Sequence, residues 1–162
     1  MNKTKLALLI FTLVLSLCTV SCTPRGADIF AFSECGATFT LIFPSENGDV
    51  TLSCTRDGVS YTAKIVSPER SRDITIVSDC GAVTVCAGGV KIPLSEAAAQ
   101  RFSCIFDVMY RGEVGATVTR SGDGECTLIS YDDGVLTLDE NGIPTEIDVG
   151  RIVKIKDYLT VE

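Results

Sequence analysis

Histidine and tryptophan are both absent from the 162 residues of this chain. Histidine is the commonest general base, the usual partner of a nucleophilic serine or cysteine, and the commonest metal ligand. Paired carboxylates could replace it, but the acidic residues fall mainly in turns, where such side chains bond to local backbone. The sequence therefore predicts no catalytic residues, no metal site and no cofactor, which indicates a protein that is not an enzyme.

An excess of positive charge is also missing, since 14 Lys and Arg stand against 21 Asp and Glu, a formal charge of −7. Nucleic-acid binding requires a basic face and, for single strands, aromatic stacking platforms. Neither is present, so we expect no nucleic-acid partner. The glycine pair Gly88-Gly89 is not followed by a phosphate-binding motif, and "DENG" at 139–142 departs from calcium-loop spacing and is interpreted as a turn.

No apolar run reaches the roughly 20 residues that a membrane-spanning helix needs. The longest, Leu6 to Leu17, follows Lys3 and Lys5 and ends in small and polar residues. A basic segment, a short apolar core and a small-residue exit are typical of an export signal. The alternative that this segment stays as an uncleaved anchor helix remains open.

The signal ends in "TVSC", Thr19 to Cys22, which resembles a bacterial lipobox, the motif whose cysteine receives a diacylglyceryl group. Thr19 departs from the pattern, in which leucine is usual. Cys18 is a poorer candidate, because bulky Leu17 precedes it. We therefore predict a signal peptide over 1–21, lipidation at Cys22, a tether over 22–28 and a single domain over 29–162. The competing interpretation is an ordinary secretory signal with two incidental cysteines.

Removal of the signal would leave 12 basic and 21 acidic residues, a formal charge of −9. Membrane attachment is then expected through the lipid, not through surface charge. Six cysteines would remain unmodified, and an even number in an exported chain is compatible with disulfides. They are scattered singly in apolar patterns, which also suits reduced, buried thiols. Both alternatives stay open for these residues: Cys35, Cys54, Cys80, Cys86, Cys104 and Cys126.

Most of the remaining chain alternates between apolar and polar residues, the period of half-buried strands. In "ATFTLIFP", Ala37, Phe39, Leu41 and Phe43 share one face. Turn residues such as Asn47-Gly48 separate the runs every 8–12 residues or so, as in a meandering antiparallel sheet. The predicted strands are 37–44, 49–55, 59–66, 73–78, 82–87, 116–120, 125–131, 135–139, 144–149 and 151–156.

One segment, "PLSEAAAQRFSCIFDVMY" at 93–110, changes to helical period. Ser95 is the expected N-cap and Gly112 the expected end of the helix. The predicted apolar stripe consists of Leu94, Ala98, Phe102, Ile105 and Met109. The sequence thus predicts a mainly β domain in which one amphipathic helix packs on an antiparallel sheet, and apolar sheet area that the helix leaves uncovered would suit a hydrophobic ligand.

The order of these elements is similar to that of LolA-like lipoproteins of clostridial and related bacteria. The likeness is carried by Pro68, by the Gly88-Gly89 turn before the helix, and by the turn Gly142, Ile143, Pro144. The resemblance implies a strongly curved, unclosed antiparallel sheet, or half-barrel, with the helix in its concavity. It also implies a role in holding an acyl chain, a lipoprotein or a protein partner. The stretch between Cys22 and the first strand leaves no room for the N-terminal helix of the soluble carrier, and predicted lipidation makes shuttling doubtful.

Taken together, these features predict a non-enzymatic lipoprotein anchored to the extracytoplasmic face of the bacterial cell membrane, binding a hydrophobic ligand or lipid on the concave sheet face. The alternative is an anchored adaptor or chaperone that docks another envelope protein. Candidate ligand-lining residues, each of which would serve equally well as core, are Phe39, Leu41, Phe43, Phe102 and Phe106.

Overall fold

The computed structural model describes residues 29–79, 82–122 and 124–161. The predicted signal, Cys18, Cys22, the tether and Cys80 lie outside the described residues. Within the described part, eleven antiparallel strands form one sheet in the order β6-β5-β4-β3-β2-β1-β11-β10-β9-β8-β7. The strands are β1 (Gly36–Phe43), β2 (Val50–Asp57), β3 (Ser60–Ser67), β4 (Thr75–Asp79), β5 (Ala82–Ala87), β6 (Val90–Pro93), β7 (Thr117–Arg120), β8 (Cys126–Tyr131), β9 (Gly134–Asp139), β10 (Pro144–Asp148) and β11 (Ile152–Val161).

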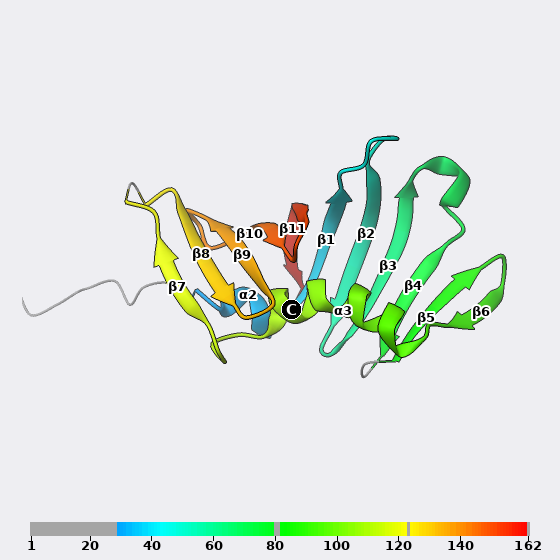
Figure 1. Ribbon diagram of the computed structural model, residues 1–162, viewed down its shortest axis with the longest axis horizontal. Helices are drawn as coiled ribbons and strands as arrows, with labels where there is room; N and C mark the ends of the chain where they lie inside the picture. The colour runs from blue at the N-terminus through cyan, green and yellow to red at the C-terminus, as the bar shows by residue number, and fades with distance from the viewer. Residues whose placement is uncertain (1–28, 80–81, 123, 162) are drawn as a thin grey trace, which may run out of the picture.

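The sheet bends into two halves and does not close, because β6 and β7 are both edges. Helix α3 (Glu96–Tyr110) lies across the hollow between the halves, and the short helix α2 (Ala31–Glu34) lies beside its end, as Figure 1 shows. A single 3₁₀ turn, η1 (Glu69–Ser71), connects β3 to β4. The predicted fold, a curved antiparallel sheet with one amphipathic helix packed on it, is confirmed.

The core lies where α3 meets the middle of the sheet. Ile105, Phe106, Val108 and Met109 of the helix are all buried. They pack with alternate residues of β1, β2 and β8–β11, such as Leu41, because every second side chain of a strand points to the same face. Ile105 and Met109 of the predicted stripe are in this core, whereas Leu94 precedes the helix and Ala98 and Phe102 are half-buried.

The helix begins and ends where the sequence placed its boundaries. Ser95 is the N-cap, although its side chain makes no capping hydrogen bond; its backbone oxygen accepts from the N–H groups of Ala98 and Ala99. At the other end, Gly112 has φ +67°, a left-handed conformation typical of the residue after a helix.

Four details differ from the sequence-based prediction. Strand β6 (Val90–Pro93) lies where no strand was predicted. A one-turn helix, α2, occupies the stretch before β1. Strand β11 continues past Lys156 to Val161, because Asp157, with φ +53°, forms a bulge that restores pairing with β1. The β8–β9 turn consists of residues 132–133, and Gly134 already belongs to β9.

Candidate functional site

The concave face is built from residues that lie directly opposite one another on neighbouring strands. Phe39 pairs with Cys54, Cys54 with Ala63, and Ala63 with Ile76, so four strands contribute to one apolar row. Paired residues of an antiparallel sheet share a face, which explains why the apolar pattern of each strand adds to a continuous surface. Phe39, Cys54 and Ala63 are buried, whereas Ile76 is only half-buried. The apolar row is therefore less deeply buried at β4 than at β1, β2 and β3.

An aromatic cluster joins α3 to this face. The rings of Tyr61 and Phe106 stack with centroids 3.9 Å apart and an interplanar angle of 13°. Phe102 lies 5.3 Å from Phe106, centroid to centroid, and the Tyr61 hydroxyl and the Ser103 hydroxyl are hydrogen-bonded at 3.2 Å. Phe39 stacks on Tyr158 of β11 at 5.7 Å. The contacts of Tyr61 attach α3 to β3, and the Phe39–Tyr158 stack joins β1 to β11 beside it.

Helix α2 is held mainly through its backbone oxygens. Arg56 of β2 donates from Nη1 to the oxygens of Ser33 and Cys35, each at 2.7 Å. The Tyr158 hydroxyl donates to the Phe32 oxygen at 2.9 Å. Hydrogen bonds from a guanidinium are among the stronger ones, because the donor is charged. A short segment with little helical stability of its own is thereby fixed at the end of the sheet.

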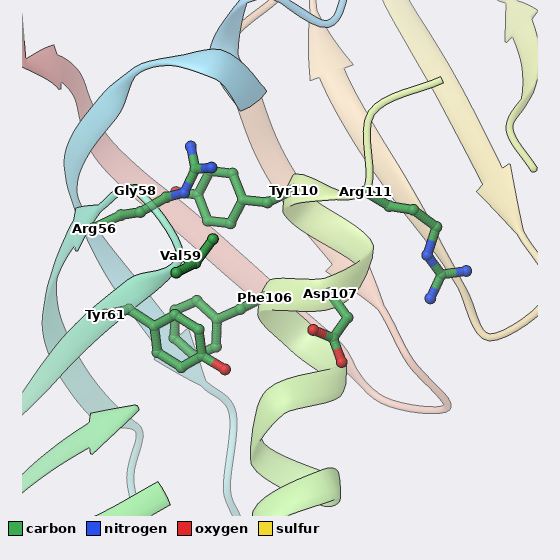
Figure 2. Close-up of a pocket in the computed structure, with 8 residues that line it drawn as sticks. All are labelled: Arg56, Gly58, Val59, Tyr61, Phe106, Asp107, Tyr110 and Arg111. Atoms are coloured by element: carbon green, nitrogen blue, oxygen red, sulfur yellow. The ribbon is translucent and has the colours of Figure 1, made fainter. Parts of the chain in front are cut away.

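Tyr110, the last residue of α3, lies under this clamp. The Arg56 guanidinium is 3.8 Å from the centre of the Tyr110 ring, and Figure 2 shows the two groups face to face. The Tyr110 hydroxyl is buried and has no hydrogen-bond partner among the described residues. Burial, followed by the neighbouring Tyr158 hydroxyl, raises the pKa of Tyr110 above its usual range, so the phenol stays neutral.

A cavity of about 360 Å³ opens between α3 and the β2–β3 turn (Figure 2). Tyr61 and Phe106 form its aromatic wall, and Val59 of the β2–β3 turn also lines it. Its charged lining residues are Arg56, Asp107 and Arg111. Desolvation raises the pKa of Asp107, and the nearby Arg111 guanidinium opposes that shift. Two arginines and one aspartate beside an aromatic wall make this cavity a small amphipathic recess with an excess of one positive charge.

Arg111 connects α3 to the β8–β9 turn. Its Nη2 donates to an Asp133 carboxylate oxygen, and this bond lowers the pKa of Asp133. The guanidinium also lies 5.1 Å from the centre of the Tyr131 ring, and the Tyr131 hydroxyl donates to the Gly112 oxygen at 2.8 Å. The end of α3 is thus bound to the β7–β11 half of the sheet as well as to β2.

A larger cavity, of about 980 Å³, lies beside α2 between the end of β11, the β9–β10 turn and strands β7 and β8. Its apolar lining comes from Ile29, Phe32, Ile143 and Leu159. Most of the other lining residues are polar or charged. The remaining lining residues are Ala31, Cys35, Arg120, Gly124, Thr127, Asp139, Glu140, Asn141, Gly142, Tyr158 and Thr160. This mixture of an apolar wall and a few polar groups is typical of ligand pockets, whose volumes are about 300–1,000 Å³.

The five candidate ligand-lining residues occupy different environments. Phe39, Leu41 and Phe106 are buried in the core, and Phe43 and Phe102 are half-buried against it. Phe106 lines the smaller cavity, whereas the lining of the larger cavity includes none of the five. Its apolar lining comes from α2 and the residues just before it, from a turn, and from the part of β11 beyond the predicted strand, none of which strand alternation reported. The apolar run "IFAF" at 29–32 and the isolated apolar Ile143 in a polar turn were the available signals.

Two other sequence-based interpretations can be compared with the structure. The "DENG" segment is a turn, in which Asp139 Oδ1 accepts from the N–H groups of Asn141 and Ile143, each at 2.9 Å.

The described cysteines are free thiols, although only Cys54 is buried. Burial raises the pKa of the Cys54 thiol to about 12, whereas Cys35 is exposed. Residues 29–79, 82–122 and 124–161 contain no group of three or more His, Cys, Asp or Glu placed to hold a metal ion. The helices in these ranges are too short or too polar to cross a membrane.

Comparison with known proteins adds one structural likeness. No family model matches the chain, and no curated protein matches it. Among solved structures, a LolA superfamily protein from Nitrosomonas europaea is similar with a TM-score of 0.46 and 12% sequence identity. The match covers 84% of this chain and 90% of that one, and it carries no assignment of function.

Proposed function

We propose that this protein is a non-enzymatic lipoprotein, anchored to the extracytoplasmic face of the bacterial cell membrane through Cys22, that binds a hydrophobic ligand or lipid in the hollow of its sheet. The observation that carries the proposal is the cavity of about 980 Å³ beside α2. Three of its apolar lining residues, Phe32, Ile143 and Leu159, come from a helix, a turn and a strand, so they converge from separate elements on one space.

The position of the cavity supports binding of an apolar molecule. One wall is α2, a single helical turn held by three hydrogen bonds to its backbone oxygens, from Arg56 and Tyr158. Tyr158 also lines the cavity and stacks on Phe39. A ligand in the cavity would therefore lie against the edge of the aromatic cluster. A small displacement of α2 would enlarge the apolar area of the protein that the ligand contacts.

Ligand binding can be tested with the Cys22→Ala chain, which would be purified without its lipid. Native mass spectrometry should show a co-purifying lipid, and the dye N-phenyl-1-naphthylamine should bind with enhanced fluorescence. Ile143→Glu should weaken dye binding by about tenfold or more, because a carboxylate would be desolvated by the apolar ligand. Ile152→Glu is the matched control, since Ile152 is similarly exposed but does not line the cavity.

The result that would contradict ligand binding is a clean protein mass with no dye uptake. Unchanged dye affinity in Ile143→Glu would place any bound molecule elsewhere. Leu159→Glu provides a second lining position, on β11, in case the turn that carries Ile143 adapts to the new charge.

A second candidate function, an anchored adaptor that docks another envelope protein, is favoured by the edge strand β7. Its four residues, Thr117–Arg120, are all exposed and include no proline. Such an edge can pair with a strand from a partner, whereas β6 at the opposite edge carries Lys91 and Pro93, which oppose pairing. A pull-down that recovers one stoichiometric protein, lost in Val118→Pro, would support the adaptor; recovery of lipid alone would exclude it.

A further inference from the structure

Several large apolar side chains among the described residues are highly exposed. Val114, Val59 and Leu159 are 77%, 72% and 65% exposed, and Val90 follows at 59%. Single exposed apolar residues are common on soluble proteins, but several gathered at one place indicate a contact surface. We call Val59, Val114 and Leu159 the apolar rim.

The strand register places two members of the rim at the same end of the sheet. The start of β1 pairs with the end of β11, Gly36 opposite Val161 and Thr38 opposite Leu159. The start of β1 also pairs with the end of β2, Ala37 opposite Arg56. Because Val59 follows β2 in the β2–β3 turn, it lies at the end of the sheet where β11 finishes and where Leu159 is located.

The third member, Val114, is in the loop from α3 to β7, and contacts of α3 and α2, not the strand register, connect this loop to the β2–β3 turn. Arg111 and Val59 line the same small cavity. A side chain at Gly112 would contact Ser33 Oγ at 3.7 Å, and the Ser33 oxygen is bonded to Arg56. Val114 therefore belongs to a loop that begins between α2 and the β2–β3 turn. Figure 1 shows the β2–β3 turn and the α3–β7 loop projecting at its lower edge.

The chain enters the fold at the same end. Ile29 lines the larger cavity together with Leu159, and it is the seventh residue after the predicted lipid anchor at Cys22. Seven extended residues span at most about 25 Å. A protein held by so short a connection stays close to the bilayer, and the end that carries the connection is the one that can reach it.

We propose that the apolar rim rests on the phospholipid bilayer to which the protein is anchored, so that both cavities open toward the lipid. This inference rests on the proposed anchor. Val59 lines the smaller cavity and Leu159 the larger, so a bilayer contact at the rim would let a lipid enter either without crossing water. The exposed acids Asp57 and Glu113 lie close to Val59 and Val114 in the chain, so the favoured surface is zwitterionic phospholipid, which does not repel carboxylates.

Tryptophan fluorescence gives a direct test, because the natural chain contains no tryptophan. The lipidated full chain would carry Val59→Trp or Val114→Trp and would be incorporated into phosphatidylcholine vesicles with brominated acyl chains, which quench buried indoles. Val90→Trp is the matched control. Like Val59, it follows a glycine in a hairpin turn and is highly exposed, but in Figure 1 its turn lies at the far right, away from the rim.

Both rim variants should show at least about twofold more quenching than Val90→Trp, together with a blue-shifted emission, because interfacial side chains insert about 5–10 Å into the headgroup and acyl boundary. Leu159→Trp is a further rim position if either valine variant folds poorly. Vesicle-bound protein whose rim tryptophans are quenched no more than Val90→Trp would overturn the rim contact and leave the anchor standing. Lipidated protein that does not float with vesicles would overturn both the anchor and the contact.

Discussion

Gly134 shows most clearly how a single residue allows one half of the sheet to pack closely on α3. A Cβ atom at this position would lie 2.8 Å from the Asp148 oxygen, 2.9 Å from Val108 Cγ2 and 3.0 Å from Val149 Cγ1. The first of these neighbours is backbone of β10 and cannot rotate away. The start of β9 therefore approaches both the helix and β10 more closely than any side chain permits.

We predict that Gly134→Ala lowers the free energy of unfolding by about 1–3 kcal/mol, the usual cost of inserting atoms into packed structure. Urea denaturation followed by circular dichroism measures it. Gly122→Ala is the control, because no atom lies within 4 Å of the added methyl group there. Equal stability of the two variants would show that β9 can move away from α3 at little cost.

Cys54 makes a prediction about alkaline stability. Burial raises the pKa of its thiol from 9.0 to about 12. The unfolded chain loses this proton near pH 9.0, whereas the folded protein retains it, so the stabilisation is complete below pH 9 and is lost as the pH rises toward 12. Stability should therefore fall above pH 9 with a slope of up to about 1.4 kcal/mol per pH unit from this group.

The contribution of Cys54 is isolated by comparison with Cys54→Ala under reducing conditions. The variant starts from lower stability because it leaves a small cavity, but its free energy of unfolding should fall less between pH 9 and 10. The window ends at pH 10 because burial also raises the pKa of Tyr110 and of Tyr158, whose ionisation adds to the loss at higher pH. Parallel curves for the two chains would contradict an enclosed thiol.

At the scale of elements, α2 depends on neighbouring side chains for its position. One helical turn does not persist alone, since nucleation of a helix is unfavourable. Its backbone oxygens at Phe32, Ser33 and Cys35 are held by Tyr158 and Arg56. Replacing Arg56 by glutamine removes the charged donor and its contact with the Tyr110 ring.

We predict that Arg56→Gln speeds amide hydrogen exchange in and just after α2 by about tenfold or more, the equivalent of one charged hydrogen bond worth about 1.5–3 kcal/mol. Exchange in the middle of α3 should stay unchanged, which separates local release of α2 from global destabilisation. Arg70→Gln is the control, because Arg70 is exposed on η1. Unchanged exchange near α2 in Arg56→Gln would mean that Phe32 packing alone holds the helix.

The elements that the sequence predicted well are those whose residues obey one period throughout. Alternation located β1, β2 and β3 and assigned Phe39 and Leu41 to the buried face, because one side of each strand meets the core. Alternation failed beyond Lys156, where the bulge at Asp157 shifts the register by one residue. It also said nothing of α2, whose four residues are fewer than the helical period needs to become visible.

The site was less predictable for a related reason. Apolar residues of the concave face and of α3 were reasonable candidates, yet packing of the helix on the sheet buries Phe39, Leu41 and Phe106 in the core. The space that remains is bounded by α2, by Ile143 in a turn and by Leu159 near the chain end. Which of these elements meet depends on sheet curvature and on the path of α2, neither of which is encoded in a local pattern.

At the scale of the whole molecule, the two cavities that are proposed to receive lipid share one end of the central strands β2 and β11. The chain enters beside α2 and both cavities have lining residues at that end, while the hairpin turns that carry Gly48 and Gly89 belong to the other end of their strands. A net negative charge of −7 gives no attraction to an anionic membrane surface. Under the proposed function, the position of this protein in the cell depends on a covalent anchor, and the anchor depends on which of two cysteines is lipidated.

Cys18 and Cys22 allow that dependence to be tested with a matched pair of substitutions. We predict that Cys22→Ala abolishes labelling with a fatty-acid analogue and moves the protein out of the membrane fraction, whereas Cys18→Ala leaves both unchanged. Membrane fractionation and metabolic labelling provide the two measurements. A chain that stays in membranes without label in Cys22→Ala would be held by an uncleaved helix, because an apolar segment can anchor a protein without lipid. A wild-type chain that is exported but never labelled would indicate an ordinary signal. Only loss of label and membrane association together, in Cys22→Ala alone, fits a diacylglyceryl anchor at the point where the chain enters the fold.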